Sequence, residues 1–194
     1  MFNKLHFHLF ITASLFSGAT HAVPVRYEGN LLPGTIVTGS VGGFSWADEI
    51  ASQTDFWRFS GVAGDTVTIT ATRGATGLDP AFSLYFGVTT ADESGFLNDA
   101  DWGGLQFLTF ADDEIDHPGP GGDPTLSGYV LPVTGGYTIA LGGFQSTTGG
   151  AYSYSLSMIS QPIPEPAAAW LMLGGLLVVG RLANRRNQAK NSGL

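Results

Sequence analysis

The sequence predicts an all-β fold, an antiparallel β-sandwich or jelly roll of about eight strands. Long helical periodicity is absent from the central part of the chain, and apolar and polar residues alternate there over short runs. Residues 66–72, for example, place their apolar side chains on one face and every threonine on the other. This alternation is typical of strands with one buried and one wet face. Turn signals rich in glycine separate the runs, as they do in β-sandwiches.

Eight runs are predicted as strands, and the segments between them as turns or loops. Residues 147–150 form a short turn between the last two strands, so we expect these two to pair as a hairpin. Residues 47–53 are expected to form one helical turn. Residues 87–104 and 111–124 are predicted as long loops. The second segment holds three prolines and three glycines, which exclude regular structure. The expected strands are residues 35–41, 55–59, 66–72, 82–86, 105–110, 127–133, 137–141 and 152–158.

The first 22 residues have the order of a secretory signal peptide and are expected to form its helix. Lys4 supplies a positive start, and residues 9–16 are mostly apolar. Thr20 and Ala22 are small residues at the −3 and −1 positions of a cleavage site, so we expect cleavage after Ala22. The alternative is a buried first strand, which does not explain the order of charge, apolar core and small residues.

Residues 23–160 are predicted to form the folded domain, and they are strongly acidic. These 138 residues hold three basic and fifteen acidic side chains, a net charge of −12. Such a surface repels phosphate backbones, which argues against nucleic acid as a partner, and makes cations the natural counter-species. The chain has no cysteine, so disulfides, zinc–thiolate sites and cysteine nucleophiles are excluded.

The C-terminal part is predicted to contain a linker at 161–166, an apolar transmembrane helix at 167–183 and a basic cytoplasmic tail at 184–194. The fourteen uncharged residues up to Gly180 span about 21 Å as a helix, against about 30 Å for a bilayer core. The span is therefore marginal as a permanent anchor and suits a transient stop. The basic residues that follow place this end in the cytoplasm and the domain outside. A buried C-terminal helix is the alternative, but the segment is apolar all round.

Three features follow one another in the C-terminal part: a Pro-Glu-Pro motif, the apolar segment and a cluster of arginines. The residues concerned are Pro164, Glu165, Pro166, Arg181, Arg185 and Arg186. Together they closely resemble the PEP-CTERM sorting signal of Gram-negative bacteria, although the tail at 187–194 is longer than is usual in that family. The resemblance implies recognition by an exosortase, a membrane cysteine protease–transpeptidase that cuts near the motif. It also implies transient anchoring in the inner membrane, followed by a place at the cell surface or in the exopolysaccharide matrix.

The body of the domain, roughly residues 50–158, contains a series of short motifs in a fixed order. They are Asp55-Phe56-Trp57-Arg58-Phe59, residues 64–69, Leu78-Asp79-Pro80, residues 82–85, Asp112-Asp113, Asp123-Pro124 and residues 136–139. The series resembles the bacterial pre-peptidase C-terminal (PPC) domain, a β-sandwich found beside secreted proteases and on surface proteins. The resemblance implies a non-catalytic role in secretion, binding or adhesion, with calcium binding in some members.

The acidic loop is the candidate metal site. Five carboxylates lie within residues 112–123, and Ca²⁺ takes six to eight oxygen ligands of this kind. Asp112, Asp113 and Asp123 are the best-placed ligands, with Asp79 as an outside candidate. The alternative is a solvated acidic loop whose aspartates serve turns. Ca²⁺ is thus the one cofactor that the sequence suggests.

The sequence argues against an enzyme. His117 is the one histidine of residues 23–160, and neither a Gly-x-Ser-x-Gly elbow nor a His-Glu-x-x-His motif is present. Trp46 and Trp102 lie outside the clean alternations and are candidates for stacking on sugars. The first hypothesis is therefore a non-enzymatic surface protein with a role in exopolysaccharide matrix, biofilm or adhesion. A calcium- or carbohydrate-binding module is the alternative, and a secreted hydrolase is the least supported.

Overall fold

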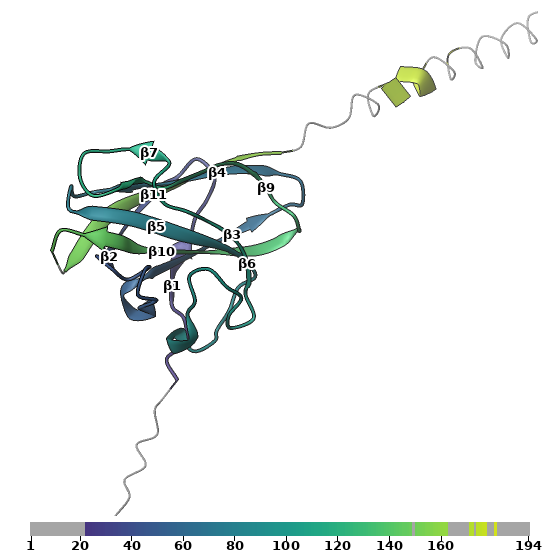
Figure 1. Ribbon diagram of the computed structural model, residues 1–194. Coiled ribbons are helices and arrows are strands. Elements are labelled where there is room, and N and C mark those ends of the chain that lie inside the picture. Colours follow the sequence, from purple (N-terminus) through teal and green to yellow (C-terminus); the bar gives the residue numbers. More distant parts are fainter. Residues whose placement is uncertain (1–21, 149, 163–170, 173, 178–180, 182–194) are drawn as a thin grey trace, which may run out of the picture.

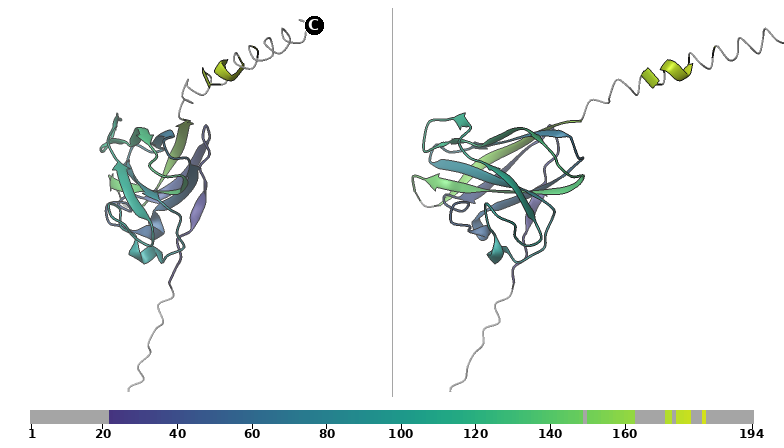
Figure 2. Two further views of the ribbon diagram at one scale, coloured as in Figure 1. Left: turned by 90° about the vertical axis from the view of Figure 1, so that its right-hand side faces the viewer. Right: turned by 45° about the vertical axis from the view of Figure 1, so that its right-hand side comes forward.

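The protein is a sandwich of two β-sheets, and the computed structural model describes residues 22–148, 150–162, 171–172, 174–177 and 181 (Figure 1). The five-stranded sheet has the order β1 (Tyr27–Asn30), β3 (Asp55–Gly61), β10 (Gly135–Ser146), β5 (Leu78–Phe86) and β6 (Gln106–Ala111). The four-stranded sheet has the order β2 (Ile36–Gly42), β11 (Ala151–Gln161), β4 (Thr66–Arg73) and β9 (Thr125–Val130). β7 (Ile115–Asp116) and β8 (Gly122–Asp123) form a small ribbon beside them. The two views of Figure 2 show both layers with the ribbon at one end.

The predicted all-β sandwich is confirmed, and all eight predicted strands are present. Three further strands, β1, β7 and β8, were not predicted. β1 has the sequence Tyr-Glu-Gly-Asn, which shows no apolar alternation, and it pairs with β3 in parallel, as an exception to the antiparallel rule. β7 and β8 have two residues each and lie inside the segment predicted as a loop.

The predicted hairpin between the last two strands is wrong. β10 pairs with β3 and β5, whereas β11 pairs with β2 and β4, so the connection between them passes from one sheet to the other. A short turn requires only that the two strands lie near one another, and it does not require that they pair. The apolar faces of both strands point into the interior, where Tyr137 and Ile139 of β10 and Leu156 and Met158 of β11 belong to one apolar cluster.

A hydrogen-bonded chain joins the layers inside this core. Trp57 of β3 donates its indole N–H to the Tyr154 hydroxyl at 2.7 Å, and Tyr154 donates to Asp55 Oδ2 at 2.6 Å. The same carboxylate accepts the backbone N–H of Ser40, in β2, at 3.2 Å. Burial raises the pKa of Asp55 despite these donors. The chain satisfies polar groups that would otherwise be costly to bury, and it fixes how the two sheets align.

The outer face of the five-stranded sheet is also covered. The segment between β5 and β6 contains the 3₁₀ turn η2 (Glu93–Gly95) and packs Phe96 and Trp102 onto Phe56 and Tyr85. Phe56 and Phe96 meet edge to face, with ring centroids 5.4 Å apart. The predicted loop at 87–104 is thus a cover for a second apolar cluster. A second 3₁₀ turn, η1 (Ala51–Gln53), lies within the segment predicted to be helical.

The predicted terminal segments lie almost wholly outside the described residues. The signal peptide up to residue 21 and the motif at 164–166 are not among them. Of the apolar segment, residues 171–172, 174–177 and 181 are described as helical. Within the described part of the chain, no helix has the length and apolar character needed to cross a membrane.

Candidate metal centre

The acidic loop lies at the end of the sandwich where β5 begins and β6 ends. β7 and β8 form a ribbon within it, with Ile115 opposite Asp123 and Asp116 opposite Gly122. In Figure 1 this ribbon projects at the same end as the connection between β10 and β11. The loop is therefore anchored to the sheets at both of its ends and folds back on β5 between them.

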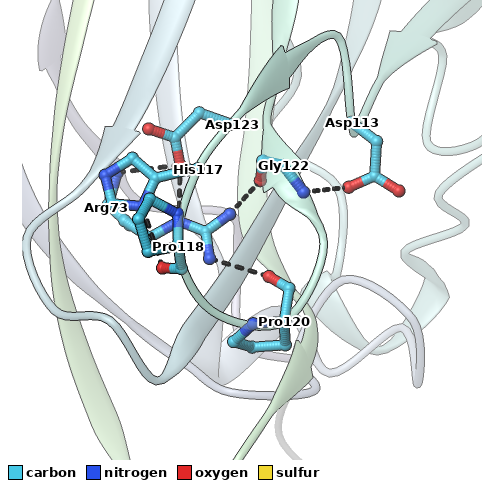
Figure 3. Close-up of polar contacts among 7 residues, drawn as sticks. All are labelled: Arg73, Asp113, His117, Pro118, Pro120, Gly122 and Asp123. Atoms are coloured by element: carbon cyan, nitrogen blue, oxygen red, sulfur yellow. Dashed lines mark hydrogen bonds and ion pairs between the residues drawn. The ribbon is translucent and has the colours of Figure 1, made fainter.

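A buried arginine holds the loop in place. Arg73, at the end of β4, is 5% exposed, and its Nε lies 2.6 Å from Asp123 Oδ1. Its Nη1 donates to the Pro120 carbonyl at 2.7 Å, and its Nη2 donates to the Gly122 carbonyl. Figure 3 shows the guanidinium facing three acceptors of one loop. All three guanidinium nitrogens are thus engaged, and none of them is hydrogen-bonded to another carboxylate.

Three other carboxylates gather beside this clamp. Asp79 of β5, Asp112 and Asp113 each offer an oxygen within 4.8 Å of the others. Asp79 is only 2% exposed. The Oδ1 atoms of Asp79 and Asp112 are buried without a hydrogen-bond partner among the described residues. A buried unpaired carboxylate is expensive, so these oxygens require a ligand that bears positive charge or a proton.

The loop backbone closes over Asp79 because of a glycine. Gly121 has a φ of +56°, and a Cβ built there would stand 2.1 Å from Asp79 Oδ1. Any larger residue would collide with the carboxylate and would also be strained at this φ. Gly121 therefore allows the loop to enclose the acidic cluster, which a side chain at this position would push open.

Asp113 and Glu114 also accept hydrogen bonds from backbone N–H groups of the loop. Asp113 Oδ1 accepts the N–H of Gly122, as Figure 3 shows. Glu114 Oε2 accepts the N–H of Asp112 at 3.1 Å and that of Thr125 at 2.9 Å. Glu114 thus orders the loop, whereas Asp113 has one oxygen that positions the loop and a second one that is free of these bonds.

Burial and mutual repulsion raise the pKa values of the cluster. Burial, followed by the charge of Asp113 and a smaller contribution from Asp123, raises the pKa of Asp79 to about 6, although Arg73 opposes the rise. Burial, followed by the charges of Asp113, Asp79 and Glu114, raises the pKa of Asp112 to about 7. Without a cation, both carboxyls are therefore partly protonated near neutral pH.

The structure brings together three of the four predicted metal ligands. Asp112, Asp113 and Asp79 share one site, whereas Asp123 faces Arg73 in the buried ion pair. Sequence reasoning missed Arg73 and Gly121. The signal for Asp79 was visible, since it is the one charged residue in the otherwise apolar or small run of β5.

The two tryptophans proposed to stack on sugars are buried, which corrects that expectation. Trp46 is 6% exposed and donates its indole N–H to Ser83 Oγ at 2.9 Å. Trp102 is 5% exposed and packs against Phe56 and Phe96. Both lie over the outer face of the five-stranded sheet, where their rings build a core and offer no open face. The sorting motif Pro164-Glu165-Pro166 lies outside the described residues, as do Arg185 and Arg186, while Arg181 is an exposed helical residue.

Comparisons with known proteins show the fold. No protein-family model matches the chain, and no curated protein matches its sequence. CorA, a surface-associated copper-binding protein important in copper acquisition by Methylomicrobium album BG8, is 14% identical, with a TM-score of 0.52 over 70% of this chain and 98% of its own.

Two further solved structures align less well. MopE, a copper-binding secreted protein of Methylococcus capsulatus, is 13% identical, with a TM-score of 0.49 over 69% of this chain and 87% of its own. The pre-peptidase C-terminal domain of a Bacillus anthracis collagenase is 15% identical, with a TM-score of 0.40 over 69% of this chain and 96% of its own. Of these three structures, CorA has the TM-score above 0.5, and at 14% identity this similarity shows the fold alone.

We predict that replacing Arg73 destabilises the protein strongly. Arg73→Met leaves the Asp123 carboxylate buried without its partner, which costs about 3–5 kcal/mol of unfolding free energy. Arg26 is exposed, so Arg26→Met should change it by less than about 0.5 kcal/mol. The double variant Arg73→Met/Asp123→Leu should recover part of the loss. Urea unfolding measures all three, and equal stabilities of the Arg73 and Arg26 variants would contradict the clamp.

The raised pKa values predict an unusual pH dependence in the absence of divalent cations. Asp79 and Asp112 have pKa values of about 6 and about 7 in the fold, above the ordinary value of 3.8. The folded state therefore binds more protons than the unfolded chain, so their contribution to stability rises as the pH falls from about 8 to about 5. Thermal melting in cation-stripped buffers measures this, and Asp79→Asn/Asp112→Asn should lack that component. Identical pH profiles for the wild type and the double variant would contradict the assignment.

Proposed function

We propose that this protein is an exported, non-enzymatic β-sandwich protein of the cell surface whose acidic loop binds a hard divalent cation, with Ca²⁺ as the best match. The observation that carries the proposal is Asp79. Its carboxylate is almost wholly buried, has an oxygen without a hydrogen-bond partner, and points at two further carboxylates. A bound cation would supply the missing countercharge.

The chemistry of the donors favours a hard ion. All three side chains offer carboxylate oxygens, which suit Ca²⁺, Mg²⁺ or Mn²⁺, whereas copper and zinc favour imidazole or sulfur. The chain has no cysteine, and His117 is directed at the Pro118 carbonyl, 3.0 Å from its Nδ1. The copper binding of CorA therefore finds little support in the residues of this loop. Ca²⁺ accepts flexible loop geometry more readily than Mg²⁺ does.

The ion would hold together two parts of the fold, β5 and the acidic loop, whose carboxylates repel one another. Asp79 belongs to β5, while Asp112 and Asp113 follow β6, the strand that pairs with it at the edge of the sheet. A cation between them would lock the loop onto the sheet edge. This is a structural role, in which the ion stabilises a surface that the loop presents.

The destination is argued from the two ends of the sequence. The signal peptide at 1–22 supports export, and the motif Pro164-Glu165-Pro166 with its apolar segment and Arg181, Arg185 and Arg186 supports sorting by an exosortase. The membrane then holds the chain only until it is processed. A place at the cell surface or in the exopolysaccharide matrix follows from this proposal, as does a role in adhesion or biofilm. The resemblance of residues 50–158 to the PPC domain, in the sequence, agrees with this proposal.

We predict that Ca²⁺ stabilises the protein through Asp79. At a Ca²⁺ concentration a hundred times the dissociation constant, binding adds about 2.7 kcal/mol, which is roughly 10 °C in melting temperature for a domain of this size. Asp79→Asn should lose the shift and melt higher than the wild type in EGTA, because it removes an unpaired buried charge.

The matched control is Asp116→Asn, an exposed acid of the same loop outside the cluster, which should keep the shift. Differential scanning calorimetry with CaCl₂ or EGTA measures these midpoints. A wild-type midpoint that is unchanged by Ca²⁺ would sink the cation site.

We also predict that the C-terminal segment is removed during export. An epitope inserted after Gln188 should be absent from the mature surface protein, whereas an epitope between β10 and β11 should remain. Replacing Pro164, Glu165 and Pro166 by alanine should leave the C-terminal epitope in the membrane fraction. Immunoblots of fractionated cells measure this, and a Gln188 epitope retained on the surface protein argues against exosortase processing.

A further inference from the structure

Two exposed phenylalanines, Phe110 and Phe144, lie on the strands on either side of β5, the strand that carries Asp79. The neighbouring strands run β10, β5, β6, and Asp79 lies on the middle one. Phe144 is the bulge residue of β10 between Gly143 and Gln145, which pair with Pro80 and Asp79. Phe110 of β6 pairs with Ser83, and Asp112 lies two residues further on, about 7 Å along an extended chain. The two strands beside β5 therefore each carry a phenylalanine close to the strand positions that lead to the proposed cation site.

Both rings rest on one buried residue. Trp46 lies with its ring centroid 5.7 Å from that of Phe110 and 5.9 Å from that of Phe144. Trp46 is itself fixed, because its indole donates to Ser83 and its backbone N–H donates to the Gly143 carbonyl at 2.9 Å. The phenylalanines, by contrast, are 50% and 41% exposed. Two half-exposed rings that pack on a fixed tryptophan offer a preorganised surface for stacking.

Glycines make this arrangement possible. The turn that carries Trp46 lies directly on β10, where a Cβ at Gly142 would stand 2.7 Å from the Trp46 backbone nitrogen. A Cβ at Gly143 would stand 2.4 Å from the Gly43 carbonyl oxygen. Side chains at these positions would lift the turn, and the Phe110 and Phe144 rings would lose their common support.

From this juxtaposition we infer that the outer face binds a glycan of pyranose rings, which stacks on Phe110 and Phe144 and donates hydroxyl oxygens to the cation held by Asp79, Asp112 and Asp113. The inference rests on the proposed cation site. Three carboxylates supply only part of the six to eight oxygens that Ca²⁺ takes, so a ligand can supply others. A pyranose has both required parts, since its C–H face suits the negative face of an aromatic ring and its vicinal hydroxyls suit a hard ion.

Phenylalanine rings give the choice of a sugar further support. A phenyl ring has no polar atom, so a ligand that stacks there must satisfy its own polar groups elsewhere, and the neighbouring ion would do this. The domain carries a net charge of −12, which disfavours acidic peptides and anionic lipid surfaces as ligands. A sugar chain bridged by the cation avoids that repulsion.

The test uses the full chain in mild detergent on an array of pyranose oligosaccharides, with CaCl₂ or with EGTA. The wild type should bind only with Ca²⁺. Phe110→Ala and Phe144→Ala should each weaken glycan binding about tenfold, the worth of one lost stacking contact, and should keep the Ca²⁺-induced rise in melting temperature. Ile159→Ala removes an apolar side chain that is 59% exposed on the other sheet and should change neither readout.

The outcomes separate the two ideas. No Ca²⁺-induced melting shift in the wild type overturns the cation site and, with it, the glycan inference. A Ca²⁺ shift with no glycan binding, or with binding that the Phe110 and Phe144 variants leave unchanged, overturns the glycan inference alone. A wild-type dimer that Phe110→Ala converts to a monomer, without glycan binding, would mean that the rings meet a second copy of the chain, which also overturns it.

Discussion

The buried ion pair between Arg73 and Asp123 organises the acidic end of this protein. An arginine side chain taken out of water needs hydrogen-bond acceptors, and this one finds a carboxylate and two backbone carbonyls within the loop at residues 120–123. These contacts give a segment rich in proline and glycine a defined path. Each of the three guanidinium nitrogens thus donates to this loop. Asp79 is close enough to feel its charge but receives no hydrogen bond from it.

The sandwich decides what lies beside the clamp. The register of β5 with β6 and β10 places Asp79 on the outer face, between an edge strand and a bulge. The same face is covered elsewhere by Phe96, Trp102 and the turn carrying Trp46. One sheet thus has a second apolar layer over most of its outside and a polar opening at one end. A site there has rigid strands beneath it and loop groups above it, as ligand sites on β-sandwiches require.

The local alternation of apolar and polar residues predicts most of the strands, whereas the pairing of strands far apart in the sequence could not be predicted from it. Alternation in residues 66–72 and 152–158 gave strands with the correct buried faces, because burial of one face is what such alternation records. The turn at 147–150 has the sequence of a hairpin turn, because a turn that joins two paired strands and a turn that connects one sheet to the other have the same local residue types. The sequence shows the acidic residues of the loop, but it does not show which residue pairs with Asp123. The partner, Arg73, is fifty positions away, and its burial depends on the whole fold. Trp46 and Trp102 lacked strand periodicity because they come from covering segments, which bury their rings without it.

The burial of Asp79 is better explained by a ligand than by packing. Asparagine has nearly the same shape and would fill the space beneath Gly121 without a charge, so packing alone does not require a carboxylate there. The charge raises the free energy of the cation-free fold, as the elevated pKa values of Asp79 and Asp112 show. A chain with fifteen acidic and three basic residues in its domain adds to that cost, because every further carboxylate repels the others. Three carboxylates held together without a hydrogen bond from Arg73 need protons or a cation to balance their charge, and the proposed cation would balance it without protonation. This links the site to the destination, since a domain sent outside the cell would complete its acidic loop from the ions it meets there.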